Sequence, residues 1–274
     1  MKSGTFNKST VTTAPTFVQV AAKNAGTVAS TTQAFGAAST TGNTIVVTIE
    51  YDHATATISS VTDTKGNTYT LAAGPTNWGV PLTHTATYVA KNITGGGAAI
   101  TITVTLSAAP ATGFEVFQTE YSGLDATNPV DQVSTAFGNN TASPANSGSK
   151  TTTEDNELIY GFAGSTTGGM TGGATYLPAR STFDTQFQGD KLAAAAGSYS
   201  VDATFAGTKY WAAHMVTLKG VRHQSVTFGG EFQPSAVLFA SAQDITRANP
   251  VAHARVGVGA VDGTTQGSTA DADF

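Results

Sequence analysis

Glu115 and Glu120 are the two acids whose type and spacing come closest to the chemistry of a glycoside hydrolase. Such an enzyme needs two carboxyl groups in one cleft, about 5–5.5 Å apart when the reaction retains configuration. An odd number of positions separates the two glutamates, and side chains alternate between the faces of a strand. We therefore predict that they lie on opposite faces, that no residue is catalytic, and that the chain is not an enzyme.

Other sequence patterns that carry chemistry are missing. There is no His-Glu-x-x-His, no Gly-x-Ser-x-Gly and no Gly-Lys pair of a phosphate-binding loop. There is also no cysteine, which excludes thiolate nucleophiles, disulfides and cysteine-bound zinc. Gly257 and Gly259 begin a dinucleotide-like pattern, but Asp262 stands where its next glycine belongs. We interpret these glycines as close packing within a strand.

The histidines are scattered singly along the chain: His53, His84, His214, His223 and His253. Because no two are closely spaced, we expect surface or hydrogen-bonded histidines rather than a zinc site. His214 falls within a predicted strand, and we expect its ring to bond a backbone carbonyl group.

Calcium is a better metal candidate than zinc, because the loops are rich in the oxygen ligands that calcium prefers. Asp125, Asn128 and Asp131 surround a proline turn, and Asp63 and Asn67 flank a second turn. Asp and Asn also stabilise turns without any ion. The sequence leaves both interpretations open, calcium sites or ordinary turns, and it predicts no other cofactor.

Aromatic side chains could form a platform on which a sugar ring stacks. The candidates are Trp78, Tyr88, Tyr210 and Trp211. Trp211 falls in an alternating strand and is better explained as a core residue. Trp78 falls in the segment 75–81, whose prolines and glycine indicate a loop, and loops often carry binding residues. We select Trp78 and Tyr88 as the ligand-binding residues.

The elements that would position these residues are strands. In residues 99–107, Ile100, Ile102, Val104 and Leu106 alternate with threonines, which is typical of a half-buried strand. Similar alternation recurs from residue 17 to residue 260, and no segment has the spacing of an amphipathic helix. We predict an all-β protein: an antiparallel, jelly-roll-like β-sandwich with a short additional C-terminal β segment.

We divide the chain into three parts. Residues 1–14 are polar and rich in threonine, and we expect a flexible segment. Residues 15–220 form the predicted β-sandwich domain, with one helical turn expected over residues 190–196. Residues 221–274 hold two or three strands, too few to bury a core alone. They would pack on the first domain, pair with another subunit, or form an incomplete second module.

Composition limits the partners and the compartment. The net charge is −5 without any cluster of Lys or Arg, which argues against nucleic-acid binding. There is no run of about 18 apolar residues, so we predict no membrane insertion. The N-terminal residues lack the apolar core of a secretion signal. We expect a virion or extracellular location, reached through a signal removed earlier or by lysis as part of a virion.

Several segments resemble a β-sandwich module of phage structural proteins and bacterial extracellular proteins. They are Asp63-Thr-Lys-Gly-Asn-Thr-Tyr69, Tyr88-Val-Ala-Lys-Asn-Ile93, Glu120-Tyr-Ser-Gly-Leu-Asp125 with Asn128-Pro129, and Trp211-Ala-Ala-His-Met-Val-Thr-Leu-Lys219. The resemblance covers roughly residues 15–220. Two later segments are similar to a phage tail or virion module: Phe228-Gly-Gly-Glu-Phe-Gln-Pro-Ser-Ala-Val-Leu-Phe239 and His253-Ala-Arg-Val-Gly-Val-Gly259. The resemblance implies architecture and transfers no catalytic residue.

These observations predict a noncatalytic structural or adhesion component of a phage virion or extracellular appendage. Its expected partners are further copies of itself or other subunits of the assembly. An alternative is a carbohydrate-binding module for cell-surface glycans, with Trp78 as the stacking residue. A glycoside hydrolase or lyase is a third hypothesis, which in its Glu115–Glu120 form needs both side chains in one cleft.

Overall fold

The computed structural model describes residues 5–12, 14–172, 181–183, 185–229, 237–242, 255–262, 265–266 and 270–273, with side-chain surroundings for 14–172 and 185–222. Within these residues every regular element is a strand, and antiparallel sheets pack together, which confirms the predicted all-β sandwich class. Contacts divide the chain into two units, Val11–His223 and a second unit of Met1–Thr10 with Gln224–Phe274.

The terminal segments contain strands of their own. β1 (Thr5–Thr12) pairs with β20 (Arg222–Gly229), so the segment 1–14, which we expected to be flexible, contains a paired strand. His253 lies outside the described residues, and so does the side chain of His223.

A further small sheet lies in the C-terminal segment. Its strands are β21 (Val237–Ala242), β22 (Arg255–Asp262), β23 (Thr265–Gln266) and β24 (Ala270–Asp273). β22 pairs with each of the other three. Gly257 and Gly259 lie inside β22, opposite Ser241 and Phe239, in a strand rather than in a nucleotide-binding turn.

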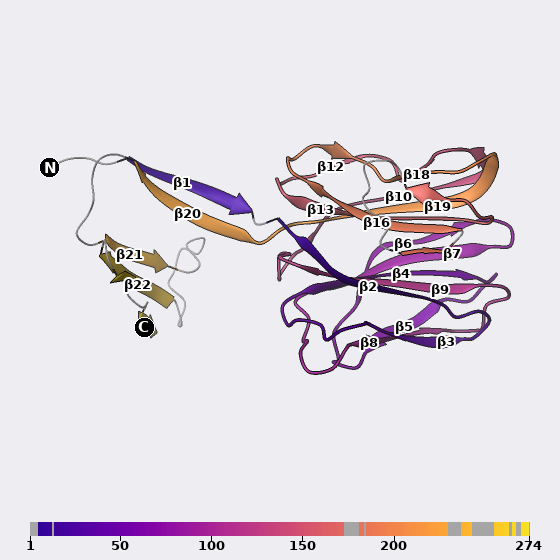
Figure 1. Cartoon of the computed structure of the whole chain (residues 1–274), viewed down its shortest axis with the longest axis horizontal. Helices are drawn as coiled ribbons and strands as arrows, with labels where there is room; N and C mark the ends of the chain where they lie inside the picture. Colours follow the sequence, from indigo (N-terminus) through magenta and orange to yellow (C-terminus); the bar gives the residue numbers. More distant parts are fainter. Residues whose placement is uncertain are drawn as a thin grey trace. The chain divides into compact units, whose positions relative to one another are not determined.

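The strands β2 to β9 of the larger unit form two facing sheets, which we call the N-terminal sandwich (Figure 1). One sheet has the order β2-β9-β4-β7-β6 and the other has the order β3-β8-β5. The strands are β2 (Thr16–Asn24), β3 (Ser30–Ala34), β4 (Thr44–Asp52), β5 (Ile58–Asp63), β6 (Thr70–Trp78), β7 (Thr83–Ala90), β8 (Thr101–Leu106) and β9 (Phe114–Ser122).

The strands β10 to β19 form the C-terminal sandwich. Its larger sheet has the order β10-β19-β13-β16-β15, and its second layer consists of β11-β18-β14 and the pair β12-β17. The strands are β10 (Val130–Ala142), β11 (Ala145–Asn146), β12 (Lys150–Thr151), β13 (Glu157–Ser165), β14 (Thr171–Gly172), β15 (Ser181–Phe183), β16 (Gln186–Ala193), β17 (Ser198–Tyr199), β18 (Asp202–Thr204) and β19 (Thr208–Leu218).

The two sandwiches have the same topology. In each, the larger sheet contains the first, eighth, third, sixth and fifth strands, when β11 with β12 and β17 with β18 each count as one interrupted strand. The smaller sheet contains the second, seventh and fourth strands in both. Double-sheet arrangements of eight strands are the jelly-roll form that the sequence predicted. Residues 15–220, treated above as one sandwich, thus hold two sandwiches of one design.

Alternating side chains build a separate apolar core on each side of a sheet. Ile45, Val47 and Ile49 point from β4 into the core of the N-terminal sandwich, whereas Val46 points to the opposite side. That second face packs against Tyr160 and other residues of the C-terminal sandwich. On β8 the threonines and the buried apolar residues alternate as residues 99–107 predicted. The alternation of apolar side chains along a strand therefore determines which of its faces packs into which core.

The larger sheets of the two sandwiches face each other, and polar side chains bridge them. The hydroxyl groups of Thr48 and Tyr160 lie 2.7 Å apart. The His214 ring bonds the hydroxyl groups of Thr76, at 2.8 Å, and Thr87, at 3.1 Å. The prediction that the His214 ring bonds a backbone carbonyl group is therefore wrong, because β6 and β7 present threonine side chains to β19. Burial lowers the pKa of His214 to about 3.

Residues 190–196 contain no helical turn. Asp190 pairs with Tyr160 and Ala193 pairs with Glu157, so the segment begins within β16. Alanine has the highest helix propensity, but propensity is a small effect, and the tertiary pairing with β13 outweighs it.

Candidate functional site

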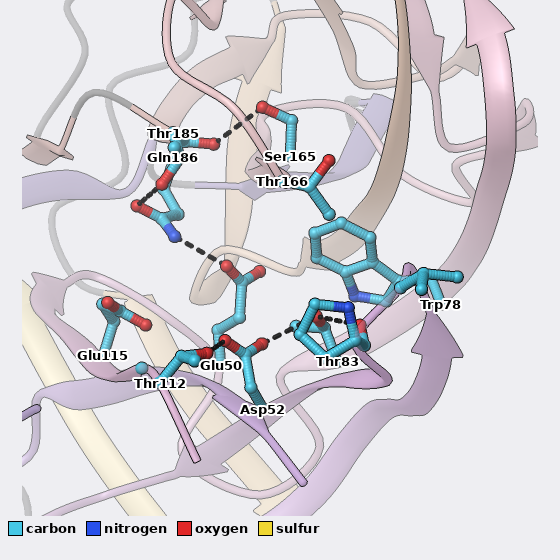
Figure 2. Close-up of a pocket in the computed structure, with 13 residues that line it drawn as sticks. Glu50, Asp52, Trp78, Thr83, Thr112, Glu115, Ser165, Thr166, Thr185 and Gln186 are labelled. Atoms are coloured by element: carbon cyan, nitrogen blue, oxygen red, sulfur yellow. Dashed lines mark hydrogen bonds between the residues drawn. The ribbon is translucent and has the colours of Figure 1, made fainter. Parts of the chain in front are cut away.

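A cavity of about 310 Å³ opens between the two sandwiches, and we call it the intersandwich cavity (Figure 2). Both sandwiches contribute to its lining, which consists of Glu50, Asp52, Trp78, Val80, Pro81, Thr83, Thr112, Gly113, Glu115, Ser165, Thr166, Thr185 and Gln186. The cavity therefore lies where β4, β6, β7 and β9 meet the ends of β13 and β16.

Strand register brings three acids to this cavity. β4 and β9 pair so that Glu50 lies directly opposite Glu115. Asp52 follows Glu50 by two positions on β4, which places it on the same face. A Cβ built on Gly113 would lie 3.3 Å from Oε1 of Glu115 and 3.4 Å from Oδ2 of Asp52. Glycine at this position thus leaves room for both carboxyl groups.

Glu50 is the most deeply buried of the three acids. Gln186 Nε2 donates a 2.6 Å hydrogen bond to its Oε1, and the Thr85 hydroxyl donates a 3.1 Å hydrogen bond to its Oε2. Burial raises the pKa of Glu50 to about 8. The hydrogen bond from Gln186 lowers this pKa, whereas the negative charges of Glu115 and Asp52 raise it further. Glu50 is therefore mostly protonated at neutral pH.

The other two acids are held by polar neighbours at the rim. The Thr83 hydroxyl donates a 2.7 Å hydrogen bond to Oδ1 of Asp52, and the Thr112 hydroxyl bonds its Oδ2. Asn24 Nδ2 donates a 3.0 Å hydrogen bond to Oε1 of Glu115. Burial, followed by the negative charge of Asp52, raises the pKa of Glu115 to about 7.

The arrangement suits a ligand with several hydroxyl groups. A protonated Glu50 donates a hydrogen bond, the carboxyl oxygens of Asp52 accept hydrogen bonds, and Glu115 changes from one role to the other near neutral pH. Ser165, Thr166 and the other polar side chains of the lining add groups that donate and accept. The same acids could exchange protons with a bound molecule.

We expect Gly164→Ala to disturb the cavity and destabilise the fold. A Cβ at Gly164 would overlap the carboxyl group of Glu50. Overpacking of this kind costs about 1–3 kcal/mol, which denaturant unfolding would measure. Gly36→Ala is the matched control, because a Cβ there meets nothing within 4 Å. Equal stability of the two variants would contradict the tight placement of Glu50.

Trp78 lies at the cavity but not in a loop. It is the last residue of β6 and is only 2% exposed, and its Nε1 donates a 2.9 Å hydrogen bond to Thr85. The loop assignment was wrong because the prolines Pro75 and Pro81 lie inside β6 and just beyond it, where the irregular pairing of β6 with β7 tolerates them. The role of Trp78 in binding stays a prediction, now through a buried wall of the cavity.

Tyr88 lies at a different cavity. This second hollow has a volume of about 470 Å³, and its lining includes Tyr51, Pro75, His84 and Tyr88. The His84 ring stacks on Tyr51 with their centroids 4.9 Å apart. Trp211 is 8% exposed within the C-terminal core, as predicted. Trp78 and Tyr88 therefore do not line one common cavity.

The candidate calcium ligands take part in turns. Asp125 Oδ1 accepts hydrogen bonds from the backbone N–H groups of Thr127 and Asn128, and the Asn128 bond is the main cause of its lowered pKa. Asp131 accepts bonds from the hydroxyl and N–H groups of Thr153. Within the part of the chain that the structure describes, no group of three or more His, Asp or Glu residues is arranged to hold a metal. Calcium binding stays a prediction.

The second candidate turn is also closed by donors. Asp63 Oδ1 accepts hydrogen bonds from the N–H groups of Lys65 and Asn67. Its Oδ2 accepts from the Asn67 amide and the Tyr69 hydroxyl. Both carboxylate oxygens of Asp63 therefore accept hydrogen bonds that stabilise the turn.

Glu120 lies away from Glu115, as the odd spacing predicted. It accepts hydrogen bonds from the backbone of Thr40 and from the side chains of Asn43 and Gln19, on the side of β9 opposite the intersandwich cavity. The neighbour of Glu115 in the cavity is Glu50, which no sequence motif singled out. The available signal was one acid within the apolar run 45–51.

Comparison with family models, with curated proteins and with solved structures gives no match. Among the described residues there is no helix of the length and apolarity needed to cross a membrane.

Proposed function

We propose that this protein is a noncatalytic structural or adhesion component of a virion or an extracellular appendage, and that its intersandwich cavity binds a cell-surface glycan. The observation that carries the glycan part is the lining of this cavity. Carboxyl, hydroxyl and amide groups surround a volume of about 310 Å³ beside the Trp78 ring. Small-molecule sites measure about 300–1,000 Å³ and are frequent at interfaces between domains.

The chemistry of a sugar matches this lining. A sugar hydroxyl group both donates and accepts hydrogen bonds, so one hydroxyl could accept from Glu50 while another donates to Asp52. The size of the cavity favours a terminal sugar residue over the middle of a long polymer. The structural part of the proposal draws on the motifs shared with phage and extracellular modules, and self-association in light scattering would test it, since a strictly monomeric protein would contradict it.

A glycan array probed with the full chain tests the binding role. We expect retention on a subset of glycans, and we expect Glu115→Gln to weaken it at least tenfold because an amide cannot supply the carboxylate oxygens that a bound hydroxyl group would meet at the rim. Asp155→Asn is the matched control, since this exposed carboxylate lies outside the cavity lining. No retention of the wild-type protein, or equal retention by Glu115→Gln, would overturn the proposal.

Glycoside hydrolysis is a second candidate, favoured by the register that sets Glu50 opposite Glu115. A protonated carboxyl group facing another carboxyl group is the arrangement that such chemistry uses. Incubation of the array-positive glycans with the protein would decide between binding and hydrolysis. New reducing ends that depend on Glu50 would make the protein an enzyme, and intact glycans would leave it a binding protein.

A further inference from the structure

The intersandwich cavity is acidic, and the described residues that line it carry no positive charge. Three of its lining residues are the acids Glu50, Asp52 and Glu115. None of its 13 described lining residues is Lys, Arg or His. The cavity thus leaves carboxyl groups in reach of a bound molecule, and no cation of the described residues lines it.

The pKa values of Glu50 and Glu115 are raised in this cavity. Burial and the charge of Asp52 raise the pKa of Glu115, and the charges of Glu115 and Asp52 raise the pKa of Glu50 further. The hydrogen bonds to these groups come from neutral side chains: Gln186 and Thr85 for Glu50, Asn24 for Glu115, and Thr83 and Thr112 for Asp52. A positive charge entering the cavity would stabilise the ionised forms.

We propose that the intersandwich cavity selects a sugar that carries a free ammonium group, an amino sugar without an N-acetyl group, over neutral and N-acetylated sugars. This inference rests on the proposed glycan-binding function and names its substrate class. The ammonium group would lie between Asp52 and Glu115, whose oxygens converge on the space above Gly113. Ring hydroxyls would then face Glu50 and the hydroxyl groups of Ser165 and Thr166 across the cavity.

Both sandwiches take part in this selection. Glu115 and Asp52 come from the N-terminal sandwich and supply charge, whereas Gln186 comes from the C-terminal sandwich and holds Glu50 by a 2.6 Å hydrogen bond. An N-acetyl group would remove the positive charge and add bulk beside Gly113. Ammonium binding should also release a proton, because Glu115 ionises when a cation approaches it.

Isothermal titration calorimetry of the full chain at pH 6 tests this inference. The probes are β-1,4-linked trimers of glucosamine, N-acetylglucosamine and glucose, together with spermidine as an amine without a sugar ring. Each titration is run in two buffers of different ionisation enthalpy, which reports the protons released. We expect the glucosamine trimer to bind at least tenfold more tightly than the other three probes and to release a proton.

Two variants assign the effect to the cavity. Glu115→Gln should abolish the proton release and reduce the preference for glucosamine to less than threefold, while Asp155→Asn should change neither. Tight binding of the glucose or N-acetylglucosamine trimer without preference for the amine would overturn the inference and leave the glycan-binding function standing. Equal binding of spermidine would overturn the assignment to a sugar. If no trimer binds and the array is also silent, the proposed function itself fails.

Discussion

Raising the pH from 4.5 to 8 should lower the free energy of unfolding of the wild-type protein, and Glu50→Gln should remove the part of this loss that belongs to Glu50, whose pKa is raised more than those of Glu115 and Glu157. The pKa of Glu50 is about 8 in the folded protein, against 4.5 for an ordinary glutamate. Across that range the unfolded chain gives up its proton while the folded chain keeps it. The folded state then binds more protons than the unfolded state. The contribution of Glu50 to stability is therefore fully present below pH 4.5, and it is lost between pH 4.5 and 8 at up to about 1.4 kcal/mol for each pH unit.

Glutamine removes the titration and preserves the shape of the side chain. Its amide oxygen can accept from Gln186, and its amide nitrogen can donate to Thr85. We expect Glu50→Gln to be more stable than the wild type at pH 8 by at least about 2 kcal/mol, in line with the large pKa increases of buried carboxyl groups. Urea unfolding at half-unit pH steps would measure this difference. Parallel curves for the two proteins would contradict a buried, protonated Glu50.

Lowering the pH from 6.5 to 3 should destabilise the fold through His214. Its folded pKa is about 3, because burial between the two sandwiches disfavours the charged ring. The unfolded chain takes up a proton as the pH falls through 6.5, and the folded chain does not. The contribution of His214 to stability is therefore complete above 6.5 and is lost progressively toward pH 3, at up to about 1.4 kcal/mol for each pH unit.

Above pH 4.5 the unfolding free energy falls with pH through Glu50 and rises with pH through His214. The effect of His214 is therefore measured in the Glu50→Gln variant. We expect His214→Gln to lower the stability at every pH, because the substitution removes the imidazole ring and its hydrogen bonds to Thr76 and Thr87. The informative quantity is the slope between pH 3.5 and 6, which should flatten in the double variant. A slope that survives the substitution would assign the acid sensitivity to other groups. Taken by themselves, the two groups place the stability maximum at about pH 5.5, midway between the unfolded pKa values of 4.5 and 6.5.

The sequence was sufficient to predict the class of fold. Alternation in residues 99–107 predicts the buried face of β8, and the run 45–51 predicts β4. The same alternation carries no information about which strands pair. It therefore could not show that β2–β9 and β10–β19 repeat one strand order, because the two sandwiches share a topology rather than a spaced motif.

The candidate site was harder to predict, for a related reason. Glu50 meets Glu115 through the register of two strands, and it meets Gln186 at a sequence separation of 136 residues. No local spacing encodes either contact. Glu115 was recognised as an acid of interest, but the partner considered for it was a residue of its own strand. The local signal of the site is a charged residue inside an apolar strand, Glu50, because burial of a charged group is costly.

The most direct test of ligand binding in the intersandwich cavity is an NMR titration of the full chain with the glucosamine trimer at pH 6, followed through backbone amide shifts. We predict that the perturbed amides cluster at Gly113, Glu115, Thr166 and Gln186, which line the cavity from both sandwiches. Perturbations confined to Tyr51 and Tyr88 would place the ligand in the second cavity instead. That result, or a spectrum unchanged at saturating trimer, would contradict our account.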